Sequence, residues 1–234
     1  MYNIKLVPLK WDSDFFGYNV AKLEVAGGEV PTFLSTSGYR LVYVFSDKPI
    51  IGLEQNLMDK KANFYTKISS NKELVNKTLL IEPFDKQKHS YNELINLTLE
   101  SGVFSRFFVD KNFVNDEYSR LYTKWIENSV SKVSALEVFV AVEHKKILGF
   151  ITLTKKAEDL ADIGLLAVSP EARGRRVAST LIEHAKISAL HHGFEQMQVV
   201  TQLDNEPAVK LYKSTGFELN ELTFIYHIWN NDTI

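Results

Sequence analysis

Apolar residues from Leu79 on form short runs that predict a series of strands. These strands are expected at 79–81, 138–143, 147–153, 163–168, 197–202, 217–222 and 224–229, with a tight turn at 144–146. Apolar positions at helical spacing predict helices over 89–103, 118–129 and 178–189 and after Asn205, and Asp116 is the candidate cap of the second. The order from Leu79 is therefore β-α-α-β-β-β-α-β-α-β-β, which is an α/β domain.

The first part of the chain has shorter patterned segments. Strands are expected at 20–25, 41–45 and 64–68, with a helix over 53–61 leading into the third strand. The stretch 9–17 holds three aromatic residues and two aspartates and is expected to be a loop, either a hydrophobic plug between domains or a ligand contact. A boundary near Val75 divides the chain into a small N-terminal α/β domain, 1–75, and a second domain, 76–234.

Composition narrows the function. The chain has 234 residues, of which 45% are hydrophobic, and this is enough for a substantial core. A net charge of -2 gives no general attraction to nucleic acid or to a membrane surface, so phosphate binding has to be local. The absence of cysteine excludes disulfides, a thiol nucleophile and a cysteine zinc site. No segment has the pattern of a signal peptide or a membrane span, and a cytoplasmic location is expected.

A basic loop follows the apolar run Ile163–Val168. Ser169 and Pro170 end the run, and Arg173, Gly174, Arg175 and Arg176 precede the next helix. Unpaired amides at a helix start and the positive end of its dipole attract phosphate, and the arginines add charge. The loop lacks the Gly-Lys-Ser/Thr and G-x-G-x-x-G patterns. It is therefore either a different phosphate site or a surface loop that caps a helix.

A second motif lies about thirty residues further on. Asn205 is a candidate cap, Pro207 lies in the first turn, and Gly216 ends the helix. Asn205 and Tyr212 are seven residues apart and so lie on one helix face. Tyr212 is either a catalytic phenol or a packed aromatic residue.

The two motifs together resemble the GNAT superfamily of acyl-CoA N-acyltransferases. RGRRVA at 173–178 fits Arg/Gln-x-x-Gly-x-Gly/Ala, except that Arg176 replaces the usual glycine, and 205–217 fits N-x-x-A-x-x-x-Y-x-x-x-G-F. The resemblance implies a mixed central sheet flanked by helices, acetyl-CoA as co-substrate and no metal. It implies cofactor contacts at Leu166, Ala167, Val168, Arg173, Gly174, Arg175, Arg176, Val177, Ala178, Ser179, Thr180, Asn205 and Ala208.

The chain also resembles the TDP-fucosamine acetyltransferase group within this superfamily. The resemblance rests on W-x-x-x-F-F-G at 11–17, SRF at 105–107, Y-x-x-W-I-E-N at 122–128 and V-x-T-Q-x-x-N at 199–205. It implies a dTDP-linked 4-amino-4,6-dideoxy sugar as the acceptor and an N-terminal domain like a truncated GNAT unit. The acceptor is expected between that domain and the SRF and WIEN segments, near Trp11, Phe15, Arg106, Tyr118, Trp125, Thr201 and Gln202.

Two other functions compete with this one. The first is acetylation of another amine, such as a peptide N-terminus, a polyamine or an antibiotic, and the second is a non-catalytic CoA-binding module. For an enzyme, the resemblance implies that Tyr212 protonates the leaving thiolate, and the lack of cysteine favours direct transfer in a ternary complex. The general base stays open among Glu127, Asp162 and a water chain, and the oligomeric state stays open between monomer and homodimer.

Overall fold

The computed structural model describes residues 6–28, 36, 38–68 and 79–230, and the chain forms two compact units. Unit 1 comprises 1–62, 202–204 and 221–234, and unit 2 comprises 63–201 and 205–220. Strands β4 (Leu57–Lys67) and β10 (Glu218–Trp229) contribute residues to both units. The boundary expected near Val75 lies outside the described residues.

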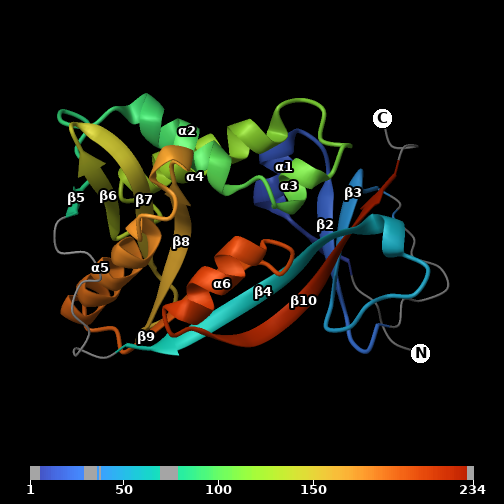
Figure 1. The fold of residues 1–234 in the computed structure, drawn as a ribbon. Coiled ribbons are helices and arrows are strands. Elements are labelled where there is room, and N and C mark those ends of the chain that lie inside the picture. Colours follow the sequence, from blue (N-terminus) through green and yellow to red (C-terminus); the bar gives the residue numbers. More distant parts are fainter. Residues whose placement is uncertain (1–5, 29–35, 37, 69–78, 231–234) are drawn as a thin grey trace. The chain divides into compact units, whose positions relative to one another are not determined.

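Unit 1 is built on a small mixed sheet (Figure 1). Its elements are β1 (Val7–Pro8), α1 (Lys10–Phe16), β2 (Val20–Val25), β3 (Leu41–Ser46) and the 3-10 turn η1 (Glu54–Asn56), with parts of β4 and β10. Strand β3 runs parallel to β2 and antiparallel to β10. Its core contains Leu23, Val42 and Val44, and the buried Tyr226 hydroxyl accepts a hydrogen bond from the amide of Ile50 (2.8 Å). The strands expected at 20–25 and 41–45 are confirmed.

Two expectations for unit 1 were wrong. The stretch 9–17 is the helix α1, which ends at Gly17 with a left-handed φ of 83°. Trp11 and Phe15 lie one turn apart on it, so their rings stack with centroids 5.1 Å apart. The helix expected at 53–61 is only the 3-10 turn, and the chain is already extended from Leu57 on. Sheet pairing therefore overrides the local helical pattern there.

Unit 2 holds a larger mixed sheet with strand order β4-β9-β8-β7-β6-β5 (Figure 1). Strands β5 to β8 are antiparallel neighbours, and β8 and β9 are parallel. His144 and Lys145 have φ values of 50° and 68°, as a tight turn between β6 and β7 requires. The elements are β5 (Leu80–Pro83), α2 (Tyr91–Ser101), α3 (Arg106–Val109), α4 (Glu117–Val130), β6 (Glu137–Glu143), β7 (Lys146–Lys155), β8 (Leu160–Val168), the 3-10 turn η2 (Pro170–Ala172), α5 (Val177–His191), β9 (Gln196–Gln202) and α6 (Glu206–Ser214).

Helices cover both faces of this sheet. Helix α2 packs on β7 and β8 and against α4, whereas α5 packs on β6, β7 and β8 (Figure 1). Val138 and Val140 belong to the core beneath α2 and α4, while Phe139 between them contacts His184 of α5, with ring centroids 4.6 Å apart. Because alternate residues of a strand face opposite ways, α5 lies on the face opposite to α2 and α4.

Three details of unit 2 differ from the sequence prediction. The expected loop at 105–113 contains the short helix α3, and the strands expected at 217–222 and 224–229 are the single strand β10. Asp116 precedes α4 in the cap position, but its side chain makes no capping hydrogen bond, and its φ is 55°. The Glu117 carboxylate instead accepts from the amide of Asn115 (2.6 Å). In the part of the chain that is described, no helix is long and apolar enough to span a membrane.

Candidate functional site

Strands β8 and β9 stop pairing halfway along their length. Their parallel register runs from Leu160 opposite Gln196 to Ile163 opposite Val199, although β8 continues to Val168. On its other edge β8 stays paired with β7 up to Val168. Within the described residues, the segment 164–168 therefore has one edge without a paired strand. It includes the expected cofactor residues Leu166, Ala167 and Val168. An extended ligand with amide groups can add to such an edge.

A β-bulge shapes the same segment. The β7–β8 register shifts between Ile151 and Leu153, and the amide of Leu165 donates to the buried Thr152 hydroxyl (2.8 Å). On β7, a Cβ atom at Gly149 would come within 2.7 Å of the Ala167 carbonyl oxygen. Bulges bend a strand and increase its twist, and the missing side chain lets the two backbones approach closely. Both features direct β8 away from β9.

The loop after β8 presents a cluster of backbone donors. Gly174 and Arg176 both have left-handed φ values, 76° and 62°, and α5 begins at Val177. Within the described residues, the amides of Gly174 and of 176–179 have no backbone acceptor. Successive amides in such a conformation, together with the helix dipole, form an anion-binding concavity. The left-handed φ at Arg176 is also why a glycine is usual at that position.

The three arginines of the loop differ in their partners. Arg173 lies 3.5 Å from Glu100, and Arg175 lies 2.5 Å from Glu143, both at exposed positions. The hydrogen bond between Arg175 and Glu143 lowers the pKa of Glu143 and raises the pKa of Arg175. Arg176 makes no ion pair within the described part of the chain. The Ser179 and Thr180 hydroxyls both donate to the Arg176 carbonyl (2.9 Å), and so brace the loop.

Helix α6 begins as the sequence predicted. The Asn205 side-chain oxygen accepts from the amide of Ala208 (3.3 Å), so Asn205 is the cap of α6 and the amide of Ala208 is already engaged. The Asn205 side-chain NH₂ group has no hydrogen-bond partner within the described residues. It is therefore available to donate to a ligand.

Tyr212 lies one and a half to two turns further along α6 and is buried, with 6% of its surface exposed. Its ring packs between Phe64 and Phe217, with centroid distances of 6.1 and 5.9 Å. Burial raises the pKa of the phenol, and the Asp162 carboxylate raises it further. The phenol therefore stays protonated at neutral pH and keeps a proton to donate.

Asp162 belongs to a polar row that crosses the sheet where β8 and β9 separate. Its carboxylate accepts from Gln198 of β9 (2.9 Å) and from the Thr154 hydroxyl of β7 (3.4 Å). Gln198 in turn accepts from Asn63 of β4 (3.4 Å). The row places a carboxylate one register position before the last paired residues, Ile163 and Val199. Sequence reasoning named Asp162 only as one of several candidates, because its partners lie on other strands.

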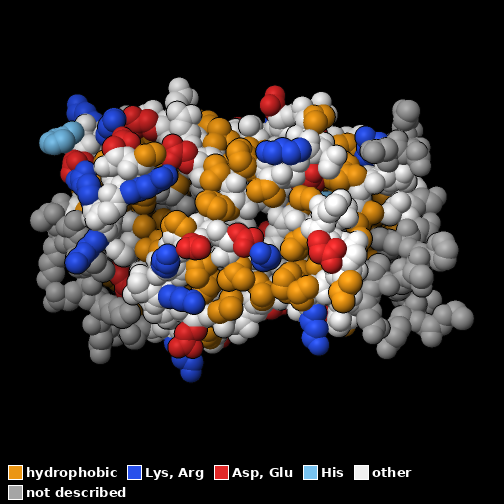
Figure 2. Space-filling model, turned by 45° about the vertical axis from the view of Figure 1, so that its right-hand side comes forward, with side chains coloured by type: hydrophobic (Ala, Val, Ile, Leu, Met, Phe, Trp, Pro, Cys, Tyr) orange, Lys and Arg blue, Asp and Glu red, His pale blue; other side chains and the backbone are white. Residues whose placement is uncertain are grey.

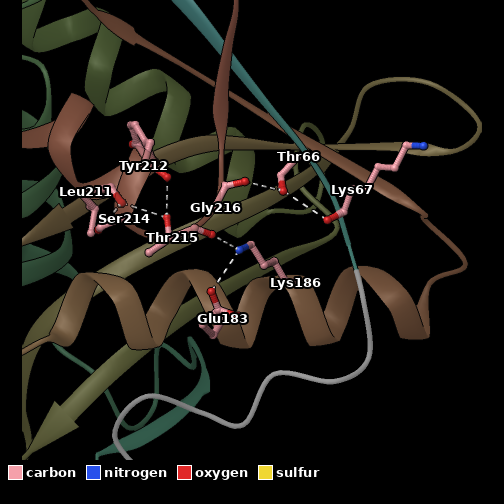
Figure 3. A network of polar contacts seen from close by, with 9 residues as sticks. All are labelled: Thr66, Lys67, Glu183, Lys186, Leu211, Tyr212, Ser214, Thr215 and Gly216. Carbon is pink, nitrogen blue, oxygen red and sulfur yellow. Dashed lines mark hydrogen bonds and ion pairs between the residues drawn. The ribbon is translucent and has the colours of Figure 1, made fainter.

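Lys186 of α5 connects this helix to α6 (Figure 3). Its ammonium group lies 3.0 Å from the Glu183 carboxylate and donates to the Thr215 carbonyl (2.5 Å) at the end of α6. Thr66 of β4 donates to the neighbouring Gly216 carbonyl (2.8 Å). Sequence reasoning missed this network, since a lysine three residues after a glutamate resembles an ordinary surface pair.

Arg106, Tyr118 and Trp125, expected near the acceptor, belong to one aromatic cluster of unit 2. The Arg106 guanidinium lies 4.4 Å from the centroid of the Phe107 ring, which meets Trp125 edge-on at 6.1 Å. Tyr118 contacts Tyr122 (4.8 Å), and its hydroxyl donates to the Leu99 carbonyl, which joins α4 to α2. Burial raises the pKa of Tyr118. Its polar tip is thus engaged within the protein, while its ring lines the cluster.

The other expected acceptor residues are divided between the units. Trp11, 50% exposed, and Phe15 lie on α1 in unit 1, and Gln202 is also counted in unit 1. Thr201 is buried in β9 of unit 2. Their role toward an acceptor stays a prediction.

Charged side chains of both signs are mixed on the surface (Figure 2). Lys and Arg side chains are interspersed with Asp and Glu on the face in view, without a continuous basic area (Figure 2). Among the residues that the structure describes, no three His, Asp or Glu side chains are grouped as metal ligands. The unpaired amides of the loop before α5 are the candidate anion site of unit 2.

Comparison with known proteins identifies the family. The model of the acetyltransferase (GNAT) family matches residues 100–217, which is 118 of 234 residues. The chain therefore belongs to the GNAT acetyltransferase family, and its mixed sheet flanked by helices is the α/β fold of that family.

Individual relatives match over parts of their length. The chain is 27% identical over 137 residues to the spore coat polysaccharide biosynthesis protein SpsD of Bacillus subtilis (strain 168), which is 58% of this chain and 46% of SpsD. It is 40% identical over 75 residues to a streptothricin acetyltransferase of Escherichia coli, 32% of this chain and 43% of that one. The chain thus spans less than half the length of both relatives.

A solved structure matches over nearly the whole chain. A functionally unknown conserved protein from Staphylococcus epidermidis ATCC 12228 superimposes with a TM-score of 0.64 and 11% identity, covering 98% of this chain and 93% of that protein. At this identity the similarity concerns the fold alone.

The ion pair between Arg175 and Glu143 predicts a test of the anion site. Glu143→Gln removes a carboxylate that competes with phosphate for Arg175, so the Kd for acetyl-CoA should fall about two- to threefold at low salt and less at high salt. Isothermal titration calorimetry at both salt concentrations measures it. Glu137→Gln, at an exposed pair with Lys132 away from the loop, is the matched control and should change nothing. Weaker acetyl-CoA binding by Glu143→Gln would contradict the assignment.

Proposed function

We propose that the protein is an acetyl-CoA-dependent N-acetyltransferase that transfers the acetyl group directly to an amine in a ternary complex. One observation carries the proposal. The segment 164–168 of β8, which has one unpaired edge, is followed directly by the loop of unpaired amides before α5. The same unit holds the buried, protonated Tyr212 phenol. An extended amide-containing arm that ends in a pyrophosphate matches the first two features, and a thiolate leaving group matches the third.

The cofactor contacts follow from these donors and acceptors. The free edge at Leu166, Ala167 and Val168 is suited to pair with the two amides of the pantetheine arm. The amides of Gly174 and of 176–179 receive the pyrophosphate, and Arg173, Arg175 and Arg176 neutralise its charge. The Asn205 side-chain NH₂ group adds a donor at the start of α6.

Tyr212 supports the leaving group. The amine nitrogen forms a bond to the thioester carbon, the carbon–sulfur bond breaks, and negative charge collects on sulfur. A thiol has a pKa of about 8.5, well below that of a phenol, so complete proton transfer from Tyr212 is unfavourable at equilibrium. The phenol therefore acts mainly through a hydrogen bond that strengthens as the thiolate forms.

Asp162 is the carboxylate that we assign as proton acceptor for the amine. It lies at the separation of β8 and β9, and its charge acts on the Tyr212 phenol. Glu127, the other carboxylate that the sequence left open, is an exposed residue of α4 that pairs with Lys124 (3.7 Å). The thioester carbon has to lie near Tyr212, so Asp162 is the better placed of the two.

For the acceptor we propose a dTDP-linked 4-amino-4,6-dideoxy sugar. The SRF and WIEN segments place a guanidinium beside several aromatic rings, which suits a base and its phosphates. The similarity to a protein named for spore coat polysaccharide biosynthesis also favours a sugar. The second candidate is an antibiotic amine, favoured by the 40% identity over 75 residues to a streptothricin acetyltransferase.

A screen of acceptors tests the function. Acetyl-CoA is incubated with the protein and with dTDP-4-amino sugars, streptothricin, polyamines or peptides, and free thiol release is followed. We expect the dTDP-4-amino sugars to have the highest kcat/KM, with initial-velocity patterns of a ternary complex. Preference for streptothricin would support the second candidate, and ping-pong kinetics would contradict direct transfer.

Replacement of the phenol tests its role in the chemistry. Tyr212→Phe keeps the ring and its packing, so kcat should fall by about 10² to 10⁴ while the Kd for acetyl-CoA stays nearly constant. Burial and the Asp162 carboxylate raise the pKa of the Tyr212 phenol, so the phenol should stay protonated below about pH 10. Wild-type kcat should therefore not fall through deprotonation of Tyr212 in that range. An unchanged kcat in a folded Tyr212→Phe protein would contradict this role and would leave packing as the only function of Tyr212.

Asp162→Asn tests the proposed base. Its kcat/KM should be about 10² lower than wild type near neutral pH. The role assigned to Asp162 is removal of the proton of the ammonium form of the acceptor, and this step is not required for acceptor that is already neutral. The deficit should therefore shrink as pH rises toward the pKa of the amine. The pH profiles of kcat/KM for both proteins measure it.

Asp159→Asn is the matched control for this substitution. Asp159 also accepts a hydrogen bond from a glutamine of β9, Gln196 (2.8 Å), but precedes β8 and lies away from the strand separation. Its kcat/KM should equal that of wild type. A deficit of Asp162→Asn that is the same at every pH would indicate a structural role for Asp162.

A further inference from the structure

Helix α5 contains an ion pair that is almost completely buried. The side chains of Lys186 and Glu183 are 8% and 5% exposed, and their charged atoms lie 3.0 Å apart. The Lys186 ammonium also donates to the Thr215 carbonyl (2.5 Å) and lies 5.0 Å from the centroid of the Phe217 ring. Lysine and glutamate are rarely buried to this extent, so the pair needs an explanation.

Fold stability alone does not account for the pair. Removing two charges from water costs much of what their attraction returns, and apolar residues of similar volume are often as stable or more stable in such places. The rest of α5 already packs through apolar side chains such as Leu181, Ile182, Ala185 and Ala189.

The ammonium holds the last turn of α6, which carries Tyr212 (Figure 3). Thr215 is the C-terminal cap of α6, and its hydroxyl donates to the carbonyls of Leu211 (3.0 Å) and Tyr212 (3.1 Å). The amide of Phe217 also donates to the Tyr212 carbonyl (3.0 Å). A cation at this end complements the helix dipole and its otherwise unpaired carbonyls. A shift of Thr215 would thus move the backbone of Tyr212.

The same helix α5 carries the anion site at its other end. Lys186 is nine residues after Val177, the first residue of α5, which corresponds to about 13 Å along the helix. A helix is stiff over this distance, so the pyrophosphate site and the Thr215 contact share one rigid support. The hydrogen bond from the Lys186 ammonium to the Thr215 carbonyl connects α5 to the end of α6.

We propose that Lys186 is a positioning residue that, through the Thr215 carbonyl, fixes the Tyr212 phenol relative to the helix that binds the cofactor pyrophosphate. Glu183 is its counter-ion and directs the ammonium toward α6. The proposal rests on the proposed acetyl transfer, in which the phenol has to meet the sulfur of a cofactor bound at the start of α5. Lys186 itself does not touch the cofactor.

A charge-free pair tests the proposal. Lys186→Met alone would leave Glu183 buried without a partner and would destabilise the protein for that reason. The double variant Lys186→Met with Glu183→Leu removes both charges and should unfold within a few degrees of wild type. Its kcat should fall about 10- to 100-fold, because a misplacement of about 1 Å is enough for such a loss. The KM for acetyl-CoA should stay within about twofold, since the anion site is at the far end of α5.

Combination with Tyr212→Phe separates positioning from general damage. If Lys186 acts through the phenol, the two changes affect kcat through the same group. Tyr212→Phe should then lower kcat by a much smaller factor in the charge-free variant than in wild type. Independent effects that multiply would overturn the proposal. Lys210→Met, at the exposed pair with Glu206 on α6, is the matched control and should leave kcat unchanged.

A spectroscopic measurement needs no acceptor. In protein labelled with 3-fluorotyrosine, the ¹⁹F line of Tyr212 is identified by its absence in Tyr212→Phe. This line should shift or broaden in the charge-free variant and stay in place in Lys210→Met. An unchanged line together with an unchanged kcat overturns the proposal.

These readouts also separate this proposal from the proposed function. If wild type turned over no amine, the acetyl transfer would be wrong, while the ¹⁹F line would still decide whether Lys186 fixes Tyr212. Should the charge-free variant not fold, the double variant Lys186→Gln with Glu183→Gln replaces it, because it removes both charges, keeps two polar groups that can hydrogen-bond to each other, and weakens the contact with Thr215. We then expect a severalfold lower kcat and a shifted Tyr212 line, with both unchanged in the control Lys210→Met. A folded variant in which kcat and the Tyr212 line are both unchanged would overturn the role of Lys186.

Discussion

The end of pairing between β8 and β9 after Ile163 is the constraint on which the site depends. Backbone groups left without partners inside a sheet are costly, so a protein retains such a gap only where water or a ligand satisfies them. The bulge at Thr152 and the missing side chain at Gly149 keep β8 curved on its paired side. The separation gives β8 a free edge and sends the chain directly into the loop of unpaired amides before α5.

A row of polar side chains crosses the sheet where β8 and β9 separate. Thr154, Asp162, Gln198 and Asn63 are linked by hydrogen bonds across four strands, at the end of the paired part of β8 and β9. On the other side, α5 and α6 are joined by the Lys186 ammonium. Two groups near the separation are thus held in place: the Asp162 carboxylate by the polar row, and the Tyr212 phenol by the end of α6. Both groups are fixed by partners distant in sequence.

Local signals explain what could be predicted from the sequence. Loop and cap residues act within a few positions, so the sequence predicts the loop at 173–176, the Asn205 cap and the position of Tyr212 on the helix that follows. The polar row and the Lys186 network depend on strand order and helix packing, which no single segment encodes. The same limit explains the errors, since α1 and α3 are short helices fixed by packing, and β4 is extended by its neighbours in the sheet. The acceptor residues stay a prediction.

The pairing of β3 with β10 has a consequence for how the chain acquires its structure. Leu41 of β3 lies opposite Trp229 of β10, a separation of 229 − 41 = 188 residues. Closing a loop of this length is slow, and domains generally form as their residues leave the ribosome. Residues of β3 are therefore made early but gain this neighbour only after every strand of unit 2 has been synthesised. During that interval the backbone groups of β3 that face β10 are unpaired, and β2, which pairs with the other edge of β3, does not cover them, so this edge is open to aggregation until β10 is made.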